Sequence, residues 1–380
     1  MELHASGTWP RIQAIGLSKR FVIFASSFLV IFLFYRLVKS LRRVEREDQQ
    51  HRKSPPLNAA TDGKVTEAAI EPLSGFDWKA TEPTRYLPIK PVYHITMALQ
   101  QDSPSRLITV DRDYLSRVTH RRQLIEQKTS TVHGCLPQGA EAVSELYSYL
   151  LRGYLPIRYP TMFTISDDGI AFHNTVTDKT FPLEPPSDPR EALRALGETV
   201  EEDLFLLHET PEGHLCVAFV CCFPAHFDPS KKMGKVLQAI HGPVPSYNKI
   251  GASMERFFSR LQVGKSAKRL NWSIQTHPEL HVIGNHVQRE AAEKQADDGL
   301  DVDSTFVRVE LQTLTRLPKT QAILFSFKTY MYGVSGIKND GLGPELADAI
   351  EGLKSGNAPD MWNYKSAGRW AKPVCEFLRS

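Results

Sequence analysis

The 380-residue sequence lacks the short motifs that mark several common classes of enzyme site. No G-x-G-x-x-G follows an expected strand, and neither a P-loop nor a G-x-S-x-G occurs. The usual signals for a dinucleotide-binding fold, a phosphate-binding loop and a serine-hydrolase elbow are therefore missing. A serine or cysteine nucleophile with partners far away along the chain stays compatible with the sequence, but no residue pattern specifically suggests one.

Cysteine is scarce and unpatterned, and charge of one sign is not in excess. The five cysteines are Cys135, Cys216, Cys221, Cys222 and Cys375. They form no C-x-x-C pair, so neither a zinc ribbon nor an iron–sulfur site is indicated. An odd number with one adjacent pair argues against a secreted disulfide framework and favours a reducing compartment. The net charge of +3, with 41% hydrophobic and 23% charged residues, describes a globular protein and predicts no nucleic-acid partner.

One long hydrophobic run is present, close to the N-terminus. Residues 21–35 carry no charge, and Leu37 and Val38 extend the run toward the roughly 20 residues that a bilayer core requires. A secretory signal peptide is the rival interpretation, but no small-x-small cleavage site follows the run. The sequence therefore predicts an N-terminal tail over residues 1–20 and an uncleaved, single transmembrane helix over residues 21–38.

The segments that flank this helix predict its orientation. Five basic residues lie on its C-terminal side, Arg36 near its edge and Lys39, Arg42, Arg43 and Arg46 beyond it, against three on the N-terminal side. Positive charge is retained on the cytosolic side, so we expect the large C-terminal part to be cytosolic. The endoplasmic reticulum membrane is the expected location, with a mitochondrial membrane as the alternative. Residues 39–74 lack sustained periodicity and predict a flexible stalk, which leaves 75–380 as the folded domain.

Hydrophobic periodicity in the folded domain predicts helices and strands in alternation. Helical spacing is found over 112–127 and 143–154, and further helices are expected to begin at Ser187 and Gly343. Apolar or alternating runs predict strands at 204–208, 215–223 and 270–276, and a hairpin formed by 307–312 and 323–330. This mixture predicts an α+β domain.

A histidine between two prolines and a helical segment is the first candidate site residue. Asp228 and Pro229 are expected to open a helix that ends at Ile240, which places His241 at its C-terminal end. The unpaired carbonyls there would make the imidazole more basic and a better metal ligand. Pro243 and Pro245 stiffen the chain that follows, and Ser246 is expected to cap the next helix. Spacing alone nevertheless favours an ordinary packed or capping histidine.

Three polar residues alternate along the predicted hairpin strand. Arg308, Glu310 and Gln312 share one face, which is either a solvated surface or the polar wall of a pocket. From the sequence alone a solvated face is the expectation. If the face is buried, Glu310 needs Arg308, Arg269 or a ligand to stabilise its charge, and such a carboxylate could move protons.

A histidine cluster and a cysteine pair are weaker candidates for ligand sites. His277, His281 and His286 lie within ten residues, but Pro278 and Gly284 break any helix that would align them, so a surface loop is expected rather than a zinc site. The Cys221-Cys222 pair lies in a buried apolar strand, where a thiol stays neutral, so core packing is expected rather than haem ligation.

Six stretches, in the same order, resemble one known family. The stretches are 93–99, 114–123, 202–207, 240–245, 269–273 and 308–318, which read YHITMAL, YLSRVTHRRQ, EDLFLL, IHGPVP, RLNWS and RVELQTLTRLP. They are similar to the haem-dependent oxidative N-demethylase alpha-subunit-like proteins, whose fungal branch is the HRQ family. The resemblance covers roughly residues 78 to 370.

That resemblance implies a PAS-like antiparallel sheet with surrounding helices, which binds haem and uses molecular oxygen to remove a methyl group from a small amine as formaldehyde. On this model His241 is the axial iron ligand, and Glu310 and Arg269 are catalytic residues. Cofactor contacts are implied for Arg308, Gln312, Trp272 and Asn271. The sequence leaves His94, His120, His208 and His226 as alternative ligands.

The sequence also departs from the family pattern. Leu311 replaces an arginine that often stands between the glutamate and the glutamine, so any contact of that side chain is in doubt. Flavin, nicotinamide and iron–sulfur motifs are missing, which predicts a separate flavin or NAD(P)H reductase as electron donor. The expected partners are thus a membrane bilayer, a reductase and a small amine. The alternative function is a non-catalytic haem-binding sensor or carrier with the same fold.

Overall fold

The computed structural model describes residues 70–284 and 300–380, which all belong to one unit of the chain, residues 64–380. The predicted tail, the predicted transmembrane helix at 21–38 and all but the end of the predicted stalk lie outside these described residues. Within the two described ranges, no helix has the length and apolar character needed to cross a bilayer. The anchor therefore stays a prediction.

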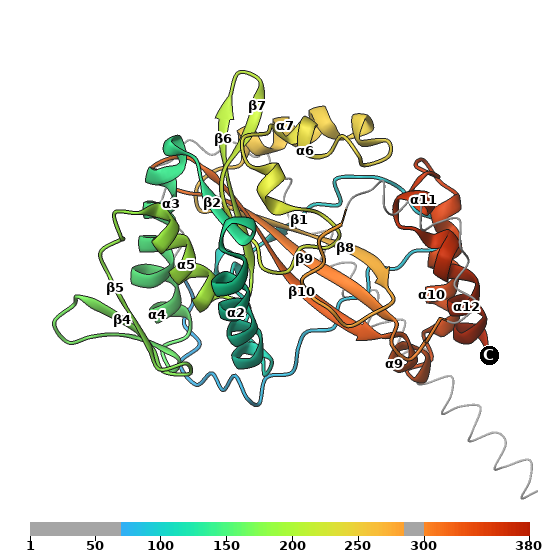
Figure 1. The fold of residues 1–380 in the computed structure, drawn as a ribbon, viewed down its shortest axis with the longest axis horizontal. Helices are drawn as coiled ribbons and strands as arrows, with labels where there is room; N and C mark the ends of the chain where they lie inside the picture. The colour runs from blue at the N-terminus through green and yellow to red at the C-terminus, as the bar shows by residue number, and fades with distance from the viewer. Residues whose placement is uncertain (1–69, 285–299) are drawn as a thin grey trace, which may run out of the picture. The chain divides into compact units, whose positions relative to one another are not determined.

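A large antiparallel sheet organises the described part of the chain (Figure 1). Its strand order is β1-β8-β9-β10-β6-β7-β2, and every neighbouring pair is antiparallel. The strands are β1 (Gln100–Asp102), β2 (His133–Cys135), β6 (Asp203–Thr210), β7 (Gly213–Val220), β8 (Ser266–Gln275), β9 (Phe306–Arg316) and β10 (Ile323–Gly333). A second, three-stranded sheet has the order β3-β4-β5, with β3 (Phe163–Ile165), β4 (Ala171–Asn174) and β5 (Lys179–Pro182). The predicted α+β class is confirmed.

The hairpin β9–β10 lies at the centre of the large sheet and confirms the alternation read from the sequence. Val307, Val309 and Leu311 are buried on one face. The connection after Arg316 is short, and the two strands pair from Phe306 with Gly333 to Arg316 with Ile323. Because side chains alternate along each strand, the polar residues Arg308, Glu310 and Gln312 of β9 face the other side of the sheet.

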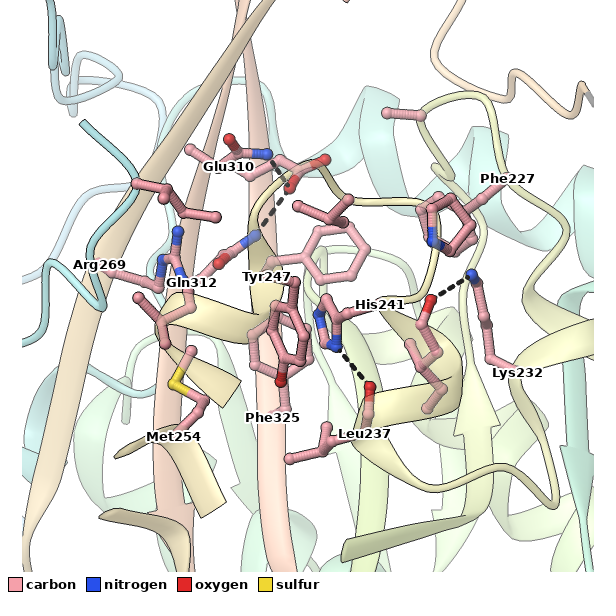
Figure 2. Close-up of a pocket in the computed structure, with 18 of the residues that line it drawn as sticks. Phe227, Lys232, Leu237, His241, Tyr247, Met254, Arg269, Glu310, Gln312 and Phe325 are labelled. Carbon is pink, nitrogen blue, oxygen red and sulfur yellow. Dashed lines mark hydrogen bonds between the residues drawn. The ribbon is translucent and has the colours of Figure 1, made fainter. Parts of the chain in front are cut away.

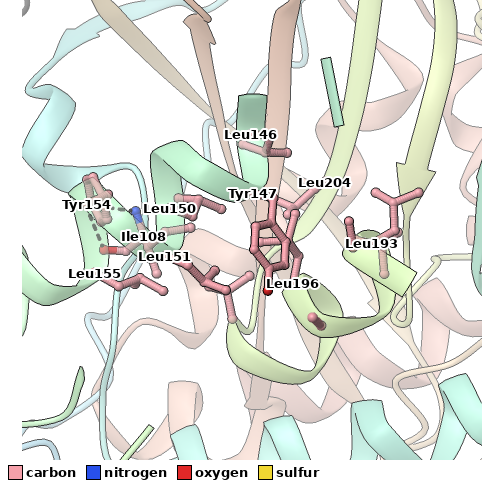
Figure 3. Close-up of a cluster of buried hydrophobic side chains, with 14 of the residues drawn as sticks. Ile108, Leu146, Tyr147, Leu150, Leu151, Tyr154, Leu155, Leu193, Leu196 and Leu204 are labelled. Atoms are coloured by element: carbon pink, nitrogen blue, oxygen red, sulfur yellow. Dashed lines mark hydrogen bonds between the residues drawn. The ribbon is translucent and has the colours of Figure 1, made fainter. Parts of the chain in front are cut away.

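Helices near the N-terminal half cover one end of the sheet. They are α2 (Tyr114–Val132), α3 (Ala140–Ser148), α4 (Leu155–Arg158) and α5 (Pro189–Thr199), with one π-helical turn at Tyr149–Tyr154 between α3 and α4. Every apolar residue that set the predicted helix at 143–154 is buried in the hydrophobic cluster of Figure 3. The helix expected to begin at Ser187 is α5, and Asp188 caps it by accepting a hydrogen bond from the Arg190 amide.

The C-terminal helices pack against the Val307, Val309 and Leu311 face of the sheet. They are α9 (Val334–Asn339), α10 (Gly343–Glu351), α11 (Met361–Tyr364) and α12 (Ala367–Arg379). The opposite face, which carries the polar residues of β9, is approached by α6 (Leu237–Ile240) and α7 (Gly251–Arg260). The space between this face and α6 and α7 holds the site described below.

The helix predicted from Asp228 to Ile240 is not continuous. Asp228 does cap a turn, accepting from the Ser230 amide, but that turn is a 3₁₀ helix over Pro229–Lys232. Gly234 then takes a left-handed conformation (φ +74°), and Val236 bridges to Leu215, so α6 keeps only Leu237–Ile240. Pairing with β7 here outweighs the helical spacing of the apolar residues.

The boundary of the folded part lies earlier than residue 75. The Leu73 amide donates to the Arg158 carbonyl at 2.9 Å, and the Glu71 amide donates to Ser105 Oγ at 2.9 Å. Ile70 and Leu73 also pack against the hydrophobic cluster of α2 to α5. The last residues of the predicted stalk therefore belong to the packed domain.

Candidate functional site

A pocket with a volume of about 290 Å³ lies between the large sheet and the segment that contains α6 and α7 (Figure 2). Its floor is formed by alternate residues of β6, β8, β9 and β10. Half of this floor is apolar and contains Phe205, Leu207, Leu314, Phe325 and Phe327. The other half, contributed by β8 and β9, is polar.

The polar half of the floor comes from two paired strands. The residues are Arg269, Asn271 and Ser273 of β8 and Arg308, Glu310 and Gln312 of β9. The register pairs Arg269 with Gln312, Asn271 with Glu310 and Ser273 with Arg308, so the six side chains share one face. Arg308 is 1% exposed and Glu310 is 8% exposed. The expectation of a solvated face is therefore wrong, because α6, α7 and their connections cover this side of the sheet.

Two neutral amides hold the carboxylate of Glu310. Gln312 Nε2 donates to Glu310 Oε2 at 2.9 Å, and Asn271 Nδ2 donates to the same oxygen at 3.4 Å. The other oxygen, Oε1, accepts no hydrogen bond from a described residue. Glu310 therefore keeps one oxygen for a ligand in the pocket.

Arg308 is held by backbone carbonyls beside the pocket. Its Nη2 donates to the Phe223 carbonyl at 2.5 Å, and its Nη1 donates to the Leu280 carbonyl at 3.1 Å and to Gln275 Oε1 at 3.3 Å. A guanidinium has five N–H donors in a fixed arrangement, and most of those of Arg308 already have acceptors. Arg308 thus joins loops to the sheet.

Arg269 differs from Arg308 because it has no acceptor among the described residues. Its Nε is buried without a hydrogen-bond partner, and no described carboxylate lies within ion-pairing distance of its guanidinium. Burial lowers the pKa of Arg269, and the nearby Tyr93, Glu310 and Tyr247 oppose that shift. The Tyr247 hydroxyl is also buried without a partner. A partly buried cation and a buried hydroxyl are therefore left for a ligand.

His241 lines the same pocket, and its imidazole is fixed on two sides. Nδ1 donates a hydrogen bond of 2.9 Å to the carbonyl oxygen of Leu237, the first residue of α6. The ring also stacks on Tyr247, with centroids 4.6 Å apart and planes 10° apart. Because Nδ1 carries the hydrogen, the neutral ring presents the lone pair of Nε2. Figure 2 shows this arrangement.

The prediction of a more basic His241 is wrong. Burial lowers the pKa of His241 to about 4, although the hydrogen bond to Leu237 acts in the opposite direction. Lys232 and Arg269, which are both cationic, lower the pKa further. A helix of four residues has a weak dipole, so desolvation dominates. The ring is consequently neutral at physiological pH, the state in which histidine binds metals.

Of the alternative histidines, only His226 lies in the pocket. It lines the wall next to Phe227, with a left-handed backbone (φ 61°). His94 is exposed, His120 packs against the ring of Phe223, and His208 is absent from the lining. Among the histidines considered from the sequence, His241 and His226 are therefore the two that line the pocket.

Trp272 is the one predicted site residue that the structure does not bring to the pocket. It lies between Asn271 and Ser273 on β8, so its side chain points to the opposite face. There it is 6% exposed and belongs to the cluster formed with the C-terminal helices. Its resemblance-based role in cofactor binding is thus not supported by its position, because neighbouring residues of a strand face opposite sides.

The residues of the two weaker clusters that the structure describes have other partners. His281 Nδ1 donates to the Cys222 carbonyl at 2.9 Å, His286 lies outside the described residues, and the described ranges contain no group of three residues able to hold a metal ion. Burial raises the pKa of the Cys221 thiol well above its ordinary value, and Cys221 Sγ donates to Asp203 Oδ2 at 3.3 Å. The thiol is a buried donor, in keeping with the expected packing role.

Several pocket residues were not predicted. Phe325 and Phe327 alternate on β10 and could have been found from the hairpin register, in which Phe325 pairs with Leu314 and Phe327 pairs with Gln312. Lys232 and Lys365 also line the pocket; Lys232 Nζ donates to the Ile240 carbonyl at 3.1 Å and Lys365 Nζ to the Trp272 carbonyl at 2.5 Å. No local pattern distinguishes these two lysines from surface lysines.

Comparison with family models identifies a family that this chain matches. Residues 98–375 match a model described as haem-dependent oxidative N-demethylase, alpha subunit-like. The match covers well over half of the chain. It includes every strand and helix that lines the pocket.

Proposed function

The chain belongs to the haem-dependent oxidative N-demethylase alpha subunit-like family, and we propose on this premise that its pocket binds haem and oxidatively demethylates a small amine. The observation that carries the proposal is the geometry of His241. Its Nδ1 is fixed on a backbone carbonyl, and its ring is neutral, so Nε2 is free to bind a metal. Metal-binding histidines typically have such an outer partner.

The residues of the pocket fit a haem group. His241 would supply a nitrogen that holds the iron. The apolar half of the floor, with Phe205, Phe325 and Phe327, offers a surface for the macrocycle. Lys232 and Arg269 provide positive charge near His241 that can balance acidic groups. This donor set suits iron, since imidazole nitrogen is a common axial ligand of haem.

Bound haem would supply the redox chemistry that activates molecular oxygen. In the overall reaction one N-methyl amine, one O2, two electrons and two protons yield the demethylated amine, formaldehyde and water. Glu310 Oε1 would accept a hydrogen bond or a proton from the amine, since Oε2 is already held by two amides. Arg269 would place a buried positive charge beside the reacting groups. Burial keeps these interactions strong because little water competes.

Two further parts of the proposal concern partners. The electrons would come from a separate flavin or NAD(P)H reductase, in line with the absence of those cofactor motifs from the sequence. Residues 21–38 would hold the domain at a membrane surface, with the domain on the cytosolic side. The endoplasmic reticulum membrane is the favoured location.

An absorption experiment on the full chain, purified in mild detergent, tests the haem site. We expect a Soret band after haem reconstitution of the unmodified chain and of His226→Ala, and a shifted or lost band in His241→Ala. A missing band in the unmodified chain would refute haem binding. A band altered only in His226→Ala would move the ligand to His226 and leave haem binding intact.

Turnover separates an enzyme from a haem-binding sensor or carrier. The reconstituted chain would be supplied with a generic flavin reductase, NADPH and N-methyl amines, and formaldehyde would be measured. We expect amine-dependent formaldehyde that disappears in Glu310→Gln while the Soret band stays. Formaldehyde that is independent of added amine would contradict the proposed reaction.

A further inference from the structure

We propose that the pocket recognises a zwitterionic N-methyl amino acid, with the substrate carboxylate on Arg269 and Tyr247 and its ammonium group on Glu310. This inference rests on the proposed function and specifies the substrate class of the same site. It follows from two opposite charges that share one wall of the pocket without neutralising each other.

The cationic side of the subsite is formed by Arg269. Its Nε is buried without an acceptor, and the buried hydroxyl of Tyr247 likewise lacks a partner among the described residues. A phenol hydroxyl carries a hydrogen that it can donate to a ligand. A guanidinium and a phenol donor are a suitable pair for a carboxylate, which accepts hydrogen bonds on both oxygens.

The anionic side is formed by Glu310. Asn271 and Gln312 both donate to Oε2, so the carboxylate is fixed by neutral groups and not by the neighbouring arginine. Oε1 has no donor among the described residues and can accept from an ammonium group. Arg269 and Glu310 are diagonal neighbours on β8 and β9, and such pairs have Cα atoms roughly 7–8 Å apart. An amino acid carries both charges on one carbon and can reach both side chains.

The charges of the lining favour a zwitterion over a simple cationic amine. Among the described residues, the pocket lining contains four cations and a single carboxylate, that of Glu310. The cations are Lys232, Arg269, Arg308 and Lys365. Arg308, Lys232 and Lys365 each donate to a backbone carbonyl. Adding a bare ammonium ion to this pocket is opposed by the cations, whereas a carboxylate on the same molecule offsets that repulsion.

The reaction of such a substrate is balanced with the co-reactants already named. N-methylglycine, O2, two electrons from the flavin reductase and two protons would give glycine, formaldehyde and water. The bond that breaks is the one between nitrogen and the methyl carbon. The carbon is oxidised to formaldehyde, and one atom of O2 is reduced to water.

A carboxylate at Arg269 could instead come from haem, whose propionate groups have the same chemistry. The two sources differ in what Arg269 controls. If the substrate supplies the carboxylate, Arg269 decides discrimination among amines and has little influence on haem affinity. If haem supplies the carboxylate, Arg269 contributes to haem affinity and has little influence on discrimination among amines.

Calorimetric titration of the full chain, with and without haem, tests the proposal with three matched ligands. N-methylglycine carries both charges, N-methylglycinamide lacks the carboxylate, and methoxyacetate lacks the ammonium group. We expect the unmodified chain to bind N-methylglycine at least about tenfold more tightly than either analogue, since charge-assisted hydrogen bonds are lost in each. If the unmodified chain binds N-methylglycine and N-methylglycinamide equally tightly, the proposal is overturned.

Variants then assign the two charges. Arg269→Gln should weaken the binding of N-methylglycine about tenfold and leave the dissociation constant of N-methylglycinamide within twofold of its original value. Glu310→Gln should remove the preference for N-methylglycine over methoxyacetate. Arg256 is an exposed arginine on α7, and Arg256→Gln serves as the control, which should leave the affinities for all three ligands unchanged. Thermal melting checks that each variant folds.

Haem titration of Arg269→Gln separates the two carboxylate sources. We expect haem affinity within twofold of the unmodified chain. Weaker haem binding together with unchanged ligand preference would assign Arg269 to a propionate and overturn the substrate proposal. If the chain binds no haem but still prefers N-methylglycine, the proposed reaction fails and the recognition site stands.

Discussion

His241 shows how burial can override a local electrostatic effect. A histidine at a helix end is expected to become more basic because the nearby carbonyls favour its charged form. Here α6 contributes a single turn, and removal from water lowers the pKa to about 4. The result is a neutral ring whose tautomer is set by Leu237. For a metal ligand this state is more useful than a basic one, since protons compete with the metal.

Haem affinity should therefore be insensitive to mild acid. An ordinary histidine, with a pKa near 6.5, would be mostly protonated at pH 5.5 and would lose about tenfold in affinity relative to pH 7.5. Because the pKa of His241 is lowered, its ring stays neutral until the pH falls to about 4. Haem titrations at pH 7.5 and 5.5 should give dissociation constants within twofold of each other. A tenfold weakening at pH 5.5 would contradict the buried, neutral state of His241.

Strand β10 carries apolar pocket residues on one face and a buried ionic cluster on the other. Lys328, between Phe327 and Thr329, is 3% exposed and donates at 2.8 Å to Asp111 Oδ2 and to Glu201 Oε1. Glu202, also buried, accepts from the Thr109 amide at 2.8 Å. Lys328 thus pairs with two carboxyl groups, Asp111 and Glu201, and together with Glu202 these contacts join β10 and the start of β6 to the chain preceding α2.

Removal of the lysine should strongly destabilise this junction. Lys328→Met leaves Asp111 and Glu201 buried without their cation, and breaking a buried pair in this way costs about 3–5 kcal/mol. Urea denaturation followed by circular dichroism measures the loss. Lys372→Met, an exposed lysine of α12, serves as the control and should change the free energy of unfolding by less than about 0.5 kcal/mol. A small loss for Lys328→Met would show that the carboxyl groups take up protons at little cost.

The same cluster predicts a pH dependence. Burial raises the pKa of Glu201 from 4.5 to about 7, although Lys328 acts against the shift. A raised carboxyl pKa gives stability that is fully present below pH 4.5 and is lost as the pH rises through 7. Glu201→Gln lacks this loss, so its melting temperature relative to the unmodified chain should rise between pH 5.5 and pH 8. A constant difference across that range would mean that Glu201 is ionised throughout.

On the scale of the whole molecule, the two faces of one sheet have separate tasks. One face is covered by α2 to α5 and α9 to α12 and forms the two larger hydrophobic clusters (Figure 1). The other face, under α6 and α7, leaves the pocket open to a ligand. A mutation of Val309 should therefore lower stability, whereas a mutation of its neighbour Glu310 should change ligand chemistry.

Membrane attachment is a prediction for the full chain. Deletion of residues 1–38 should move the protein from the carbonate-resistant membrane fraction to the supernatant, because the deletion removes the hydrophobic run. Deletion of residues 1–20 alone is the matched control and should leave the protein in the membrane fraction. Equal fractionation of the full chain and the 1–38 deletion would contradict the predicted anchor.

The elements with strong periodicity and the family could be predicted from the residue patterns alone. Alternation along β9 and helical spacing at 143–154 follow directly from which residues are apolar, so the hairpin, the main helices and the shared face of Arg308, Glu310 and Gln312 were predictable. The six matching stretches pointed to the family that the model match confirms. Local patterns carry this information because they depend on neighbours in the chain.

Which faces of the sheet are buried, and which side chains cover them, depends on packing between distant segments. The polar face of β9 looks solvated in the sequence, and packing of α6 and α7 turns it into a pocket wall. The same packing lowers the pKa of His241, and strand geometry directs Trp272 away from the pocket. Lys232 and Lys365 join the lining from distant parts of the chain. Burial and charge pairing depend on contacts between residues far apart in sequence, which no local pattern encodes.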